Sequence, residues 1–87
     1  MKVRLLSEIE WDGNALVVTA VTNSGNAICR VPRDTIHQLR IYSDAISREI
    51  GLQRQEIVER LAPFLDAKLL HAKAGDTVEL FPWEVAD

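Results

Sequence analysis

The chain has one cysteine and no long apolar run among its 87 residues. The lone Cys29 can form no internal disulfide, which agrees with a reducing compartment. No apolar stretch reaches the roughly 18 residues that a membrane span requires. The first ten residues, MKVRLLSEIE, carry charges within their apolar part, so we expect no signal peptide. These absences predict a cytoplasmic protein that makes no membrane contact.

The sequence also lacks the motifs of common enzyme and cofactor sites. It contains no glycine-rich phosphate loop, no nucleophile elbow, no HExxH and no paired-cysteine spacing. We interpret Cys29 as a buried structural thiol in a strand, and His37 and His71 as ordinary helix-surface residues. The resulting hypothesis is a protein that is not an enzyme and that holds no metal and no cofactor.

A surplus of basic side chains is missing as well. Thirteen Asp and Glu residues stand against ten Lys and Arg residues, which gives a net charge of −3. Domains that bind duplex nucleic acid by counterion release usually carry a clear basic surplus, so the composition disfavours nucleic acid as a partner.

Hydrophobic residues make up 47% of the chain, which is a normal value for a globular protein. The length corresponds to a single domain, residues 1–87. A domain this small buries only roughly 60% of its unfolded surface, so self-association as a homodimer is an open alternative to a monomer.

The first third of the chain shows the alternation of strands. Residues 2–6 alternate charged and apolar side chains and predict an edge strand, which Ile9 and Trp11 are candidates to continue. Residues 12–14, Asp-Gly-Asn, are a strong turn signal. Residues 15–22 are rich in Val and Thr and predict a second strand.

A second turn and a return strand follow. Residues 23–26, Asn-Ser-Gly-Asn, predict the turn of a hairpin, and residues 27–31 predict its return strand, which Pro32 ends. A last short strand is expected over residues 77–81, where apolar and polar residues alternate before Pro82. Beyond it, we expect residues 84–87 to form a loose tail.

Two segments between these strands have helical periodicity. Residues 33–50 predict one amphipathic helix that Gly51 closes, because apolar positions step by three and four. These positions are Ile36, Leu39, Ser43, Ile46 and Ile50.

Residues 52–74 carry a stronger apolar stripe. Its members are Ile57, Val58, Leu61, Phe64 or Leu65, Leu69 and Leu70. Pro63 interrupts this segment and lacks an N–H, so we favour two helical pieces, 53–61 and 63–74, with Gly75 as C-cap. An unbroken helix with a kink is the alternative.

The expected order of elements is β-β-β-α-α(-α)-β. We therefore predict an α+β fold in which a small antiparallel sheet packs on two or three helices. An N-terminal hairpin or meander and a C-terminal strand form the sheet.

Several short motifs are spread along the chain: Trp11-Asp12, 17–20, Gly25, Ile28-Cys29-Arg30-Val31, Ile36, Arg54, Ile57 and Gly75-Asp76-Thr77-Val78. Together they resemble a family of small bacterial proteins that is known as a domain of unknown function, DUF1488. The resemblance covers nearly the whole chain. It implies a short bacterial α+β domain, and it supplies no catalytic residues.

Two groups of residues remain as candidates for binding. Arg33, His37 and Arg40 fall on one face of the predicted helix, and Arg30 lies just before it, so these four could contact an anion or a nucleic-acid backbone. The alternative interpretation is a solvated helix face. Trp83 follows the last strand beside Pro82 and could anchor a partner protein, or simply pack against the hairpin.

From these features we expect a non-enzymatic protein-interaction or accessory module, with another protein or a second copy of the chain as its partner. The alternative function is a nucleic-acid-binding regulator that uses the Arg/His helix face.

Overall fold

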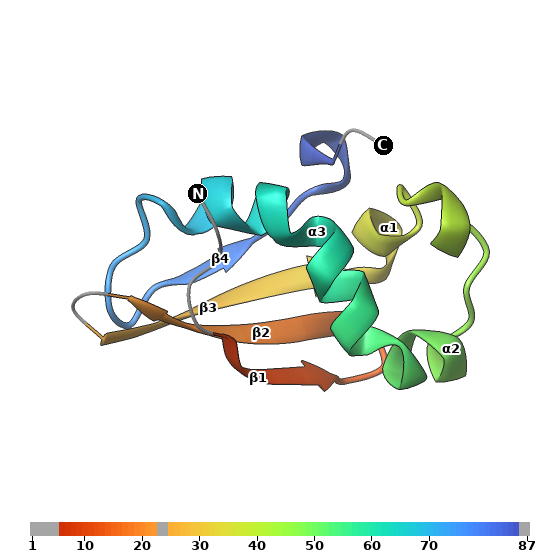
Figure 1. Ribbon diagram of the computed structural model, residues 1–87, viewed down its shortest axis with the longest axis horizontal. Coiled ribbons are helices and arrows are strands. Elements are labelled where there is room, and N and C mark those ends of the chain that lie inside the picture. Colours follow the sequence, from red (N-terminus) through yellow and green to blue (C-terminus); the bar gives the residue numbers. More distant parts are fainter. Residues whose placement is uncertain (1–5, 23–24, 86–87) are drawn as a thin grey trace.

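A four-stranded sheet with helices on one face forms the framework of the protein (Figure 1). The computed structural model describes residues 6–22 and 25–85. The strands are β1 (Leu6–Trp11), β2 (Ala15–Thr22), β3 (Gly25–Pro32) and β4 (Thr77–Glu79). The α-helices are α1 (Arg33–Ile36), α2 (Ser47–Leu52) and α3 (Arg54–Leu69), and the 3₁₀ turns are η1 (Arg40–Tyr42) and η2 (Pro82–Glu84). The predicted α+β class and order of elements are confirmed.

The strands lie in the order β1-β2-β3-β4, and the sheet is mixed. β1, β2 and β3 form an antiparallel meander, whereas β4 runs parallel to β3. The expected purely antiparallel sheet is therefore corrected at its last strand. The reason is that the helices carry the chain back to the end of the sheet where β3 begins, so the next strand must point the same way as β3.

The side chains of β2 and β3 alternate between the helix-covered face and the opposite face, as the sequence predicts. Leu16, Val18 and Ala20 on β2 are buried, while Val21 on the other face is 37% exposed. On β3 the residues Ala27, Cys29 and Val31 are fully buried. This alternation fixes the register, since a shift by one residue would turn the apolar set toward solvent.

β1 occupies one edge of the sheet, as expected, and covers Leu6–Trp11. The predicted strand over residues 2–6 lies outside the described residues except for its last position. The turn at residues 12–14 is confirmed, because the Asp12 carboxylate accepts hydrogen bonds from the N–H groups of Asn14 and Ala15, both at 2.8 Å. Gly13 has φ +96°, a conformation that favours glycine.

α3 supplies most of the helical side of the core. Ile57, Val58, Leu61 and Leu65 are buried, and Leu69 packs against the same cluster. The predicted stripe is confirmed except at Leu70, which is 57% exposed at the end of α3. The favoured division into two pieces is wrong, because α3 continues through Pro63. Pro63 and Glu59, whose carbonyl loses its helical donor, are both exposed, so water can satisfy that carbonyl.

The predicted helix over residues 33–50 is wrong. Leu39 and Ile46 have extended backbones, with ψ of 122° and 165°, and divide the segment into α1, η1 and α2. Tyr42 and Ala45 lie off the predicted stripe and are buried, whereas Ile46 on the stripe is 60% exposed. The segment winds, so two of the five predicted stripe positions, Ser43 and Ile46, are exposed.

The two glycines that were expected to end helices have other roles. Gly51 lies inside α2. Gly75 has φ +87° in a turn after α3, where its N–H donates to the Asn26 carbonyl at 2.8 Å. The predicted loose tail is also wrong at its start, because Glu84 is part of η2 and Val85 is buried.

Candidate functional site

Trp83 is the most exposed large apolar side chain in the described part of the chain, at 78%. It lies on η2, which follows the buried Leu80 at the end of the sheet. Its ring stacks on that of Phe81, with centroids 4.8 Å apart and planes within 2° of parallel. Stacking on one side therefore restrains the ring while the rest of it faces solvent.

Glu84 fixes the short turn that carries Trp83. Its carboxylate accepts a hydrogen bond from the Phe81 N–H at 2.8 Å, and its own N–H donates to the Phe81 carbonyl at 3.0 Å. The Lys68 ammonium, on α3, donates to both carboxylate oxygens of Glu84 at 3.0 Å. The same ammonium lies 5.1 Å from the centroid of the Phe81 ring. The turn is thus closed from within and tied to α3.

These contacts set the ionisation of Glu84. The hydrogen bond from the Phe81 N–H is the main cause that lowers the pKa of this carboxyl below 4.5; burial opposes the shift, and the hydrogen bond and charge of Lys68 favour it. The carboxylate that closes the turn is therefore charged at neutral pH. The sequence predicted Trp83 as a binding anchor, and its exposure fits that role without testing it.

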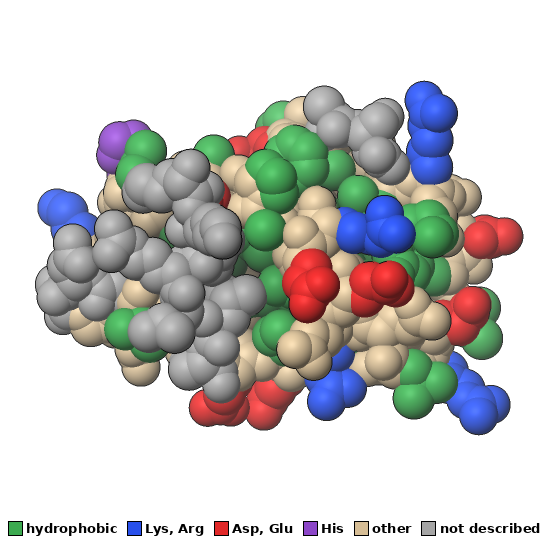
Figure 2. Space-filling model, in the orientation of Figure 1, with side chains coloured by type: hydrophobic (Ala, Val, Ile, Leu, Met, Phe, Trp, Pro, Cys, Tyr) green, Lys and Arg blue, Asp and Glu red, His purple; other side chains and the backbone are tan. Residues whose placement is uncertain are grey.

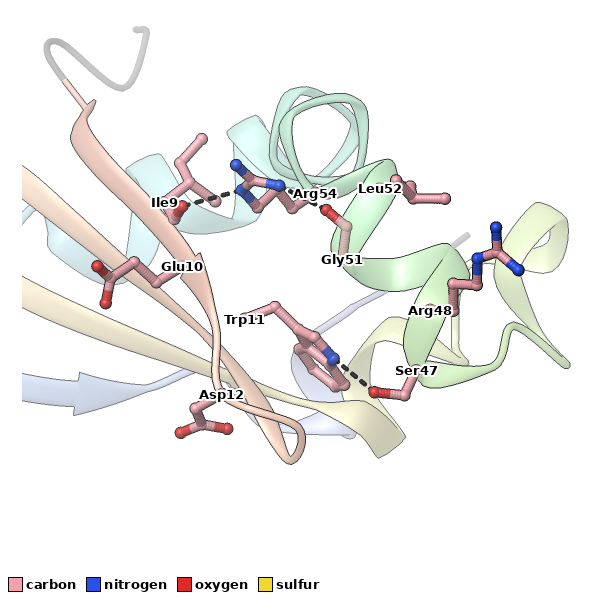
Figure 3. Close-up of a pocket in the computed structure, with 9 residues that line it drawn as sticks. All are labelled: Ile9, Glu10, Trp11, Asp12, Ser47, Arg48, Gly51, Leu52 and Arg54. Atoms are coloured by element: carbon pink, nitrogen blue, oxygen red, sulfur yellow. Dashed lines mark hydrogen bonds between the residues drawn. The ribbon is translucent and has the colours of Figure 1, made fainter.

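A second surface lies at the β1 edge of the sheet, between β1 and α2. An open hollow of about 640 Å³ is lined there by Ile9, Trp11, Gly51, Leu52 and other residues of these elements (Figure 3). The Trp11 indole N–H donates to the Ser47 hydroxyl at 2.7 Å and so joins the edge strand to α2. A Cβ on Gly51 would lie 3.4 Å from Trp11 Cδ1, at the lower limit of ordinary contact, so α2 packs closely on the indole ring.

Arg54 closes one end of the hollow. Its Nε donates to the Ile9 carbonyl at 3.1 Å, and its Nη1 donates to the Gly51 carbonyl at 2.7 Å (Figure 3). One guanidinium therefore joins the sheet edge to the end of α2. Sequence reasoning missed this hollow because Ser47 and Arg54 lie far from Ile9 and Trp11 in the sequence, and no pattern signals these contacts.

The predicted Arg/His face is divided among separate contacts. Arg33 donates to the Gly13 carbonyl at 2.9 Å, and its guanidinium lies 5.7 Å from the centroid of the Trp11 ring. Arg30 pairs with the Asp12 carboxylate at 3.6 Å, and the His37 ring is hydrogen-bonded to the Ala45 carbonyl at 3.0 Å. Arg40 lies in η1 rather than in the same helix as Arg33. The helical alignment that motivated the face is wrong, while anion binding by these four residues stays a prediction.

The interpretation of Cys29 as a buried thiol is confirmed. Its side chain is fully buried, and burial raises the pKa of the thiol to about 11. A reactive cysteine needs the opposite shift. Within residues 6–22 and 25–85, no group of three or more His, Cys, Asp or Glu side chains is placed to hold a metal ion. None of the described helices is both long and apolar enough to cross a bilayer.

No family model, curated protein or solved structure matches the chain. The resemblance to DUF1488 therefore stays a prediction.

Proposed function

We propose that this protein is a non-enzymatic interaction or accessory module and that Trp83 is its principal anchor for a protein partner. The observation that carries this proposal is the combination of exposure and restraint at Trp83. The ring is 78% exposed, yet it is stacked on Phe81 and borne by a turn that Glu84 and Lys68 close.

Such an arrangement suits binding because it lowers the entropic cost of association. A tryptophan presents a large apolar surface with few rotatable bonds, and a ring that is already restrained loses little freedom when a partner covers it. Tryptophans of this kind are enriched among the interface residues whose truncation costs about 2 kcal/mol or more. The partner is another protein or a second copy of the chain.

The test compares three forms of the protein in sedimentation and in affinity capture. We expect the native protein to self-associate at high micromolar concentration or to retain a protein partner, and Trp83→Ala to lose this interaction. Leu70→Ala is the matched control, because Leu70 is also an exposed apolar side chain, at 57%, but lies at the end of α3. A monomeric native protein without any captured partner would contradict the proposal.

A nucleic-acid-binding regulator is the alternative. Positive and negative side chains are interspersed on the face seen in Figure 2, and the predicted contact residues Arg30, Arg33 and His37 are engaged within the protein. Both features weaken this alternative. It would require binding to duplex or single strands that falls steeply with salt and is reduced when Arg33 and Arg40 become Ala. Absence of binding at low salt would eliminate it.

The cytoplasmic location and the bacterial family expected from the sequence belong to the same proposal. Fractionation of expressing cells checks the first, since a cytoplasmic module should remain in the soluble fraction that contains no membranes.

A further inference from the structure

The outer edge of β1 has backbone groups that no described strand pairs. In an antiparallel ladder, alternate residues direct their N–H and C=O groups toward the partner strand and away from it. The Ile9 carbonyl accepts a hydrogen bond from Arg54 and therefore points away from β2. Within residues 6–22 and 25–85, Arg54 is the one group that is hydrogen-bonded to this outward backbone of Ile9. Such an edge is a template for another strand.

The side chains of β1 divide between the two faces of the sheet. Glu8 and Glu10 point away from the helices, whereas Ile9, between them, packs against the core. Figure 3 shows the side chain of Glu10 directed away from α2. Both carboxylates are exposed, and neither has a hydrogen bond or ion pair within the described part of the chain. The edge therefore presents two unpaired acids on one face and an apolar side chain on the other.

The hollow on the helix side of this edge does not favour either sign of charge. Of its lining residues, Glu10 and Asp12 are acidic and Arg48 and Arg54 are basic. Leu52 is 74% exposed in its wall. The strand that suits this edge therefore carries apolar side chains on the side of the hollow and basic side chains opposite the two acids of β1.

A segment of this kind precedes β1 in the sequence. Residues 2–5, Lys-Val-Arg-Leu, alternate basic and apolar side chains with the period of a strand. If this segment of a second copy runs antiparallel to β1 with its Val3 opposite Ile9, the two residues exchange two backbone hydrogen bonds. The Ile9 carbonyl has two lone pairs, so it can accept from both Arg54 and the Val3 N–H. Val3 then shares the face of Ile9, beside the hollow.

The same register pairs opposite charges across the two strands. It places Arg4 opposite Glu8. Lys2 lies opposite Glu10, and both pairs occupy the non-hydrogen-bonded positions, where facing side chains are closest. A shift by one residue would turn the basic side chains away from these acids. Because the two copies are identical, the β1 edge of the second copy receives the N-terminal segment of the first, and the contact closes as a symmetric dimer.

We propose that two copies of this chain associate through their β1 edges, each adding residues 2–5 as a strand beside β1 of the other. The β1 edge lies across the sheet from β4, which η2 and Trp83 follow. The inference goes beyond the proposed function and does not rest on it, because this dimer leaves the Trp83 turn of each copy available to a different protein.

Sedimentation and hydrogen exchange of the native protein test the pairing. We expect a dimer at high micromolar concentration and, over the same range, slower exchange of the Ile9 amide, which the added strand covers. The Glu10 amide is the internal control, since it already faces β2 and should change far less with protein concentration. A monomer at these concentrations, or exchange at Ile9 that is independent of concentration, would overturn the inference.

Reversed charges test the register. Glu8→Lys/Glu10→Lys places like charges opposite one another, and Lys2→Glu/Arg4→Glu does the same from the other strand. Each variant alone should therefore dimerise at least about tenfold more weakly than the native protein. A mixture of the two variants restores opposite charges at every pair and should form a heterodimer. An unfolded variant could not produce this recovery, so the mixture separates lost pairing from lost folding.

Two further variants are controls. Asp44→Lys/Glu59→Lys makes the same change of net charge as the reversal on β1, at exposed positions outside β1, and should dimerise as the native protein does. Trp83→Ala should also dimerise normally while it loses a captured protein, so failure of the dimer and failure of the Trp83 proposal are distinguishable. Loss of the dimer in either control, or no heterodimer in the mixture, would contradict association through β1.

Discussion

The two tryptophans of this protein have opposite environments. Trp11 is held on several sides: its indole N–H donates to Ser47, the Arg33 guanidinium lies over its ring, and Gly51 approaches its edge. Trp83 is stacked on Phe81 and is 78% exposed in the described part of the chain. The same side chain therefore joins secondary-structure elements at one site and presents an apolar surface to solvent at the other.

This difference separates a tryptophan that stabilises the fold from one whose ring is exposed to solvent. A tryptophan that connects β1 to α2 contributes to folding through packing and a hydrogen bond. A tryptophan that stacks on one neighbouring ring contributes little to the free energy of unfolding. Stability therefore does not explain why Trp83 is a tryptophan. Each of the following predictions tests this distinction.

The largest effect on stability is expected for truncation of Trp11. Trp11→Ala should lower the free energy of unfolding by about 2–3 kcal/mol, less than for a fully buried tryptophan because the ring is only partly buried. Trp83→Ala should change it by less than about 0.5 kcal/mol. Urea unfolding of both variants measures the two values. Similar losses would remove the distinction between the two sites.

Removal of the Ser47 hydroxyl should have a smaller effect. Ser47→Ala leaves the Trp11 indole N–H without its acceptor and should cost about 1 kcal/mol in urea unfolding. Ser43→Ala is the control, because Ser43 is exposed and lies outside α2. A loss no larger than that of the control would show that the link between Trp11 and α2 contributes nothing to stability.

A methyl group at Gly51 should stabilise the Trp11 site slightly. Gly51 lies inside α2, and an added Cβ would meet Trp11 Cδ1 at 3.4 Å, the lower limit of ordinary contact. Because alanine is the better helix former, Gly51→Ala should raise the free energy of unfolding by about 0.5–1 kcal/mol. Thermal unfolding checks the sign; a lower melting temperature would mean that the approach of Trp11 to α2 requires glycine.

Acidification should weaken both tryptophan sites, in sequence. The pKa of Glu84 is lowered from 4.5 chiefly by the Phe81 N–H, and the pKa of Asp12 is lowered from 3.8 chiefly by the Asn14 N–H. Because both shifts are downward, the stability they contribute is complete above the unfolded pKa and is lost as pH falls through the folded one.

Unfolding measured between about pH 6 and about pH 3 tests this order. Glu84→Gln should remove part of the pH dependence that begins below pH 4.5, and Asp12→Asn the part that begins below pH 3.8. Unchanged profiles in both variants would show that these carboxylates do not stabilise the folded state.

The sheet could be predicted from the sequence because its strands obey one simple rule. Side chains alternate with a period of two, and Leu16, Val18, Cys29 and Val31 all face the core as that period requires. α3 was also predicted, because Ile57, Leu61 and Leu65 repeat over several turns. Its continuity through Pro63 was not, since burial on both sides of the proline outweighs a local defect that solvent can satisfy.

The segment from α1 to α2 could not be predicted from periodicity. Ile36 and Ile50 are buried as a helical stripe would require, but the intervening Leu39 and Ile46 are extended. The Ile46 N–H donates to the Glu49 carboxylate at 3.2 Å, which favours the start of a new helix at Ser47. The path of the chain between α1 and α2 depends on the tertiary burial of Tyr42 and Ala45. The spacing of apolar residues along the sequence does not predict this burial.

The candidate sites show the same division. Exposure of Trp83 could be inferred from its place after Pro82, but the turn that restrains it depends on Lys68 from α3. The hollow at β1 depends on Arg54 and Ser47, which are distant from Trp11 in the sequence. Contacts between remote segments are what sequence patterns omit.

Acrylamide quenching of two single-tryptophan variants, Trp11→Phe and Trp83→Phe, tests the central claim most directly. Each variant is measured as the free protein and again either with the captured partner or at a concentration at which the protein self-associates. We predict that Trp83, which remains in Trp11→Phe, is strongly quenched in the free protein and becomes shielded in the complex, while quenching of Trp11 hardly changes. Equal accessibility of the two tryptophans in the free protein, or quenching of Trp83 that is unchanged by the partner, would contradict the account.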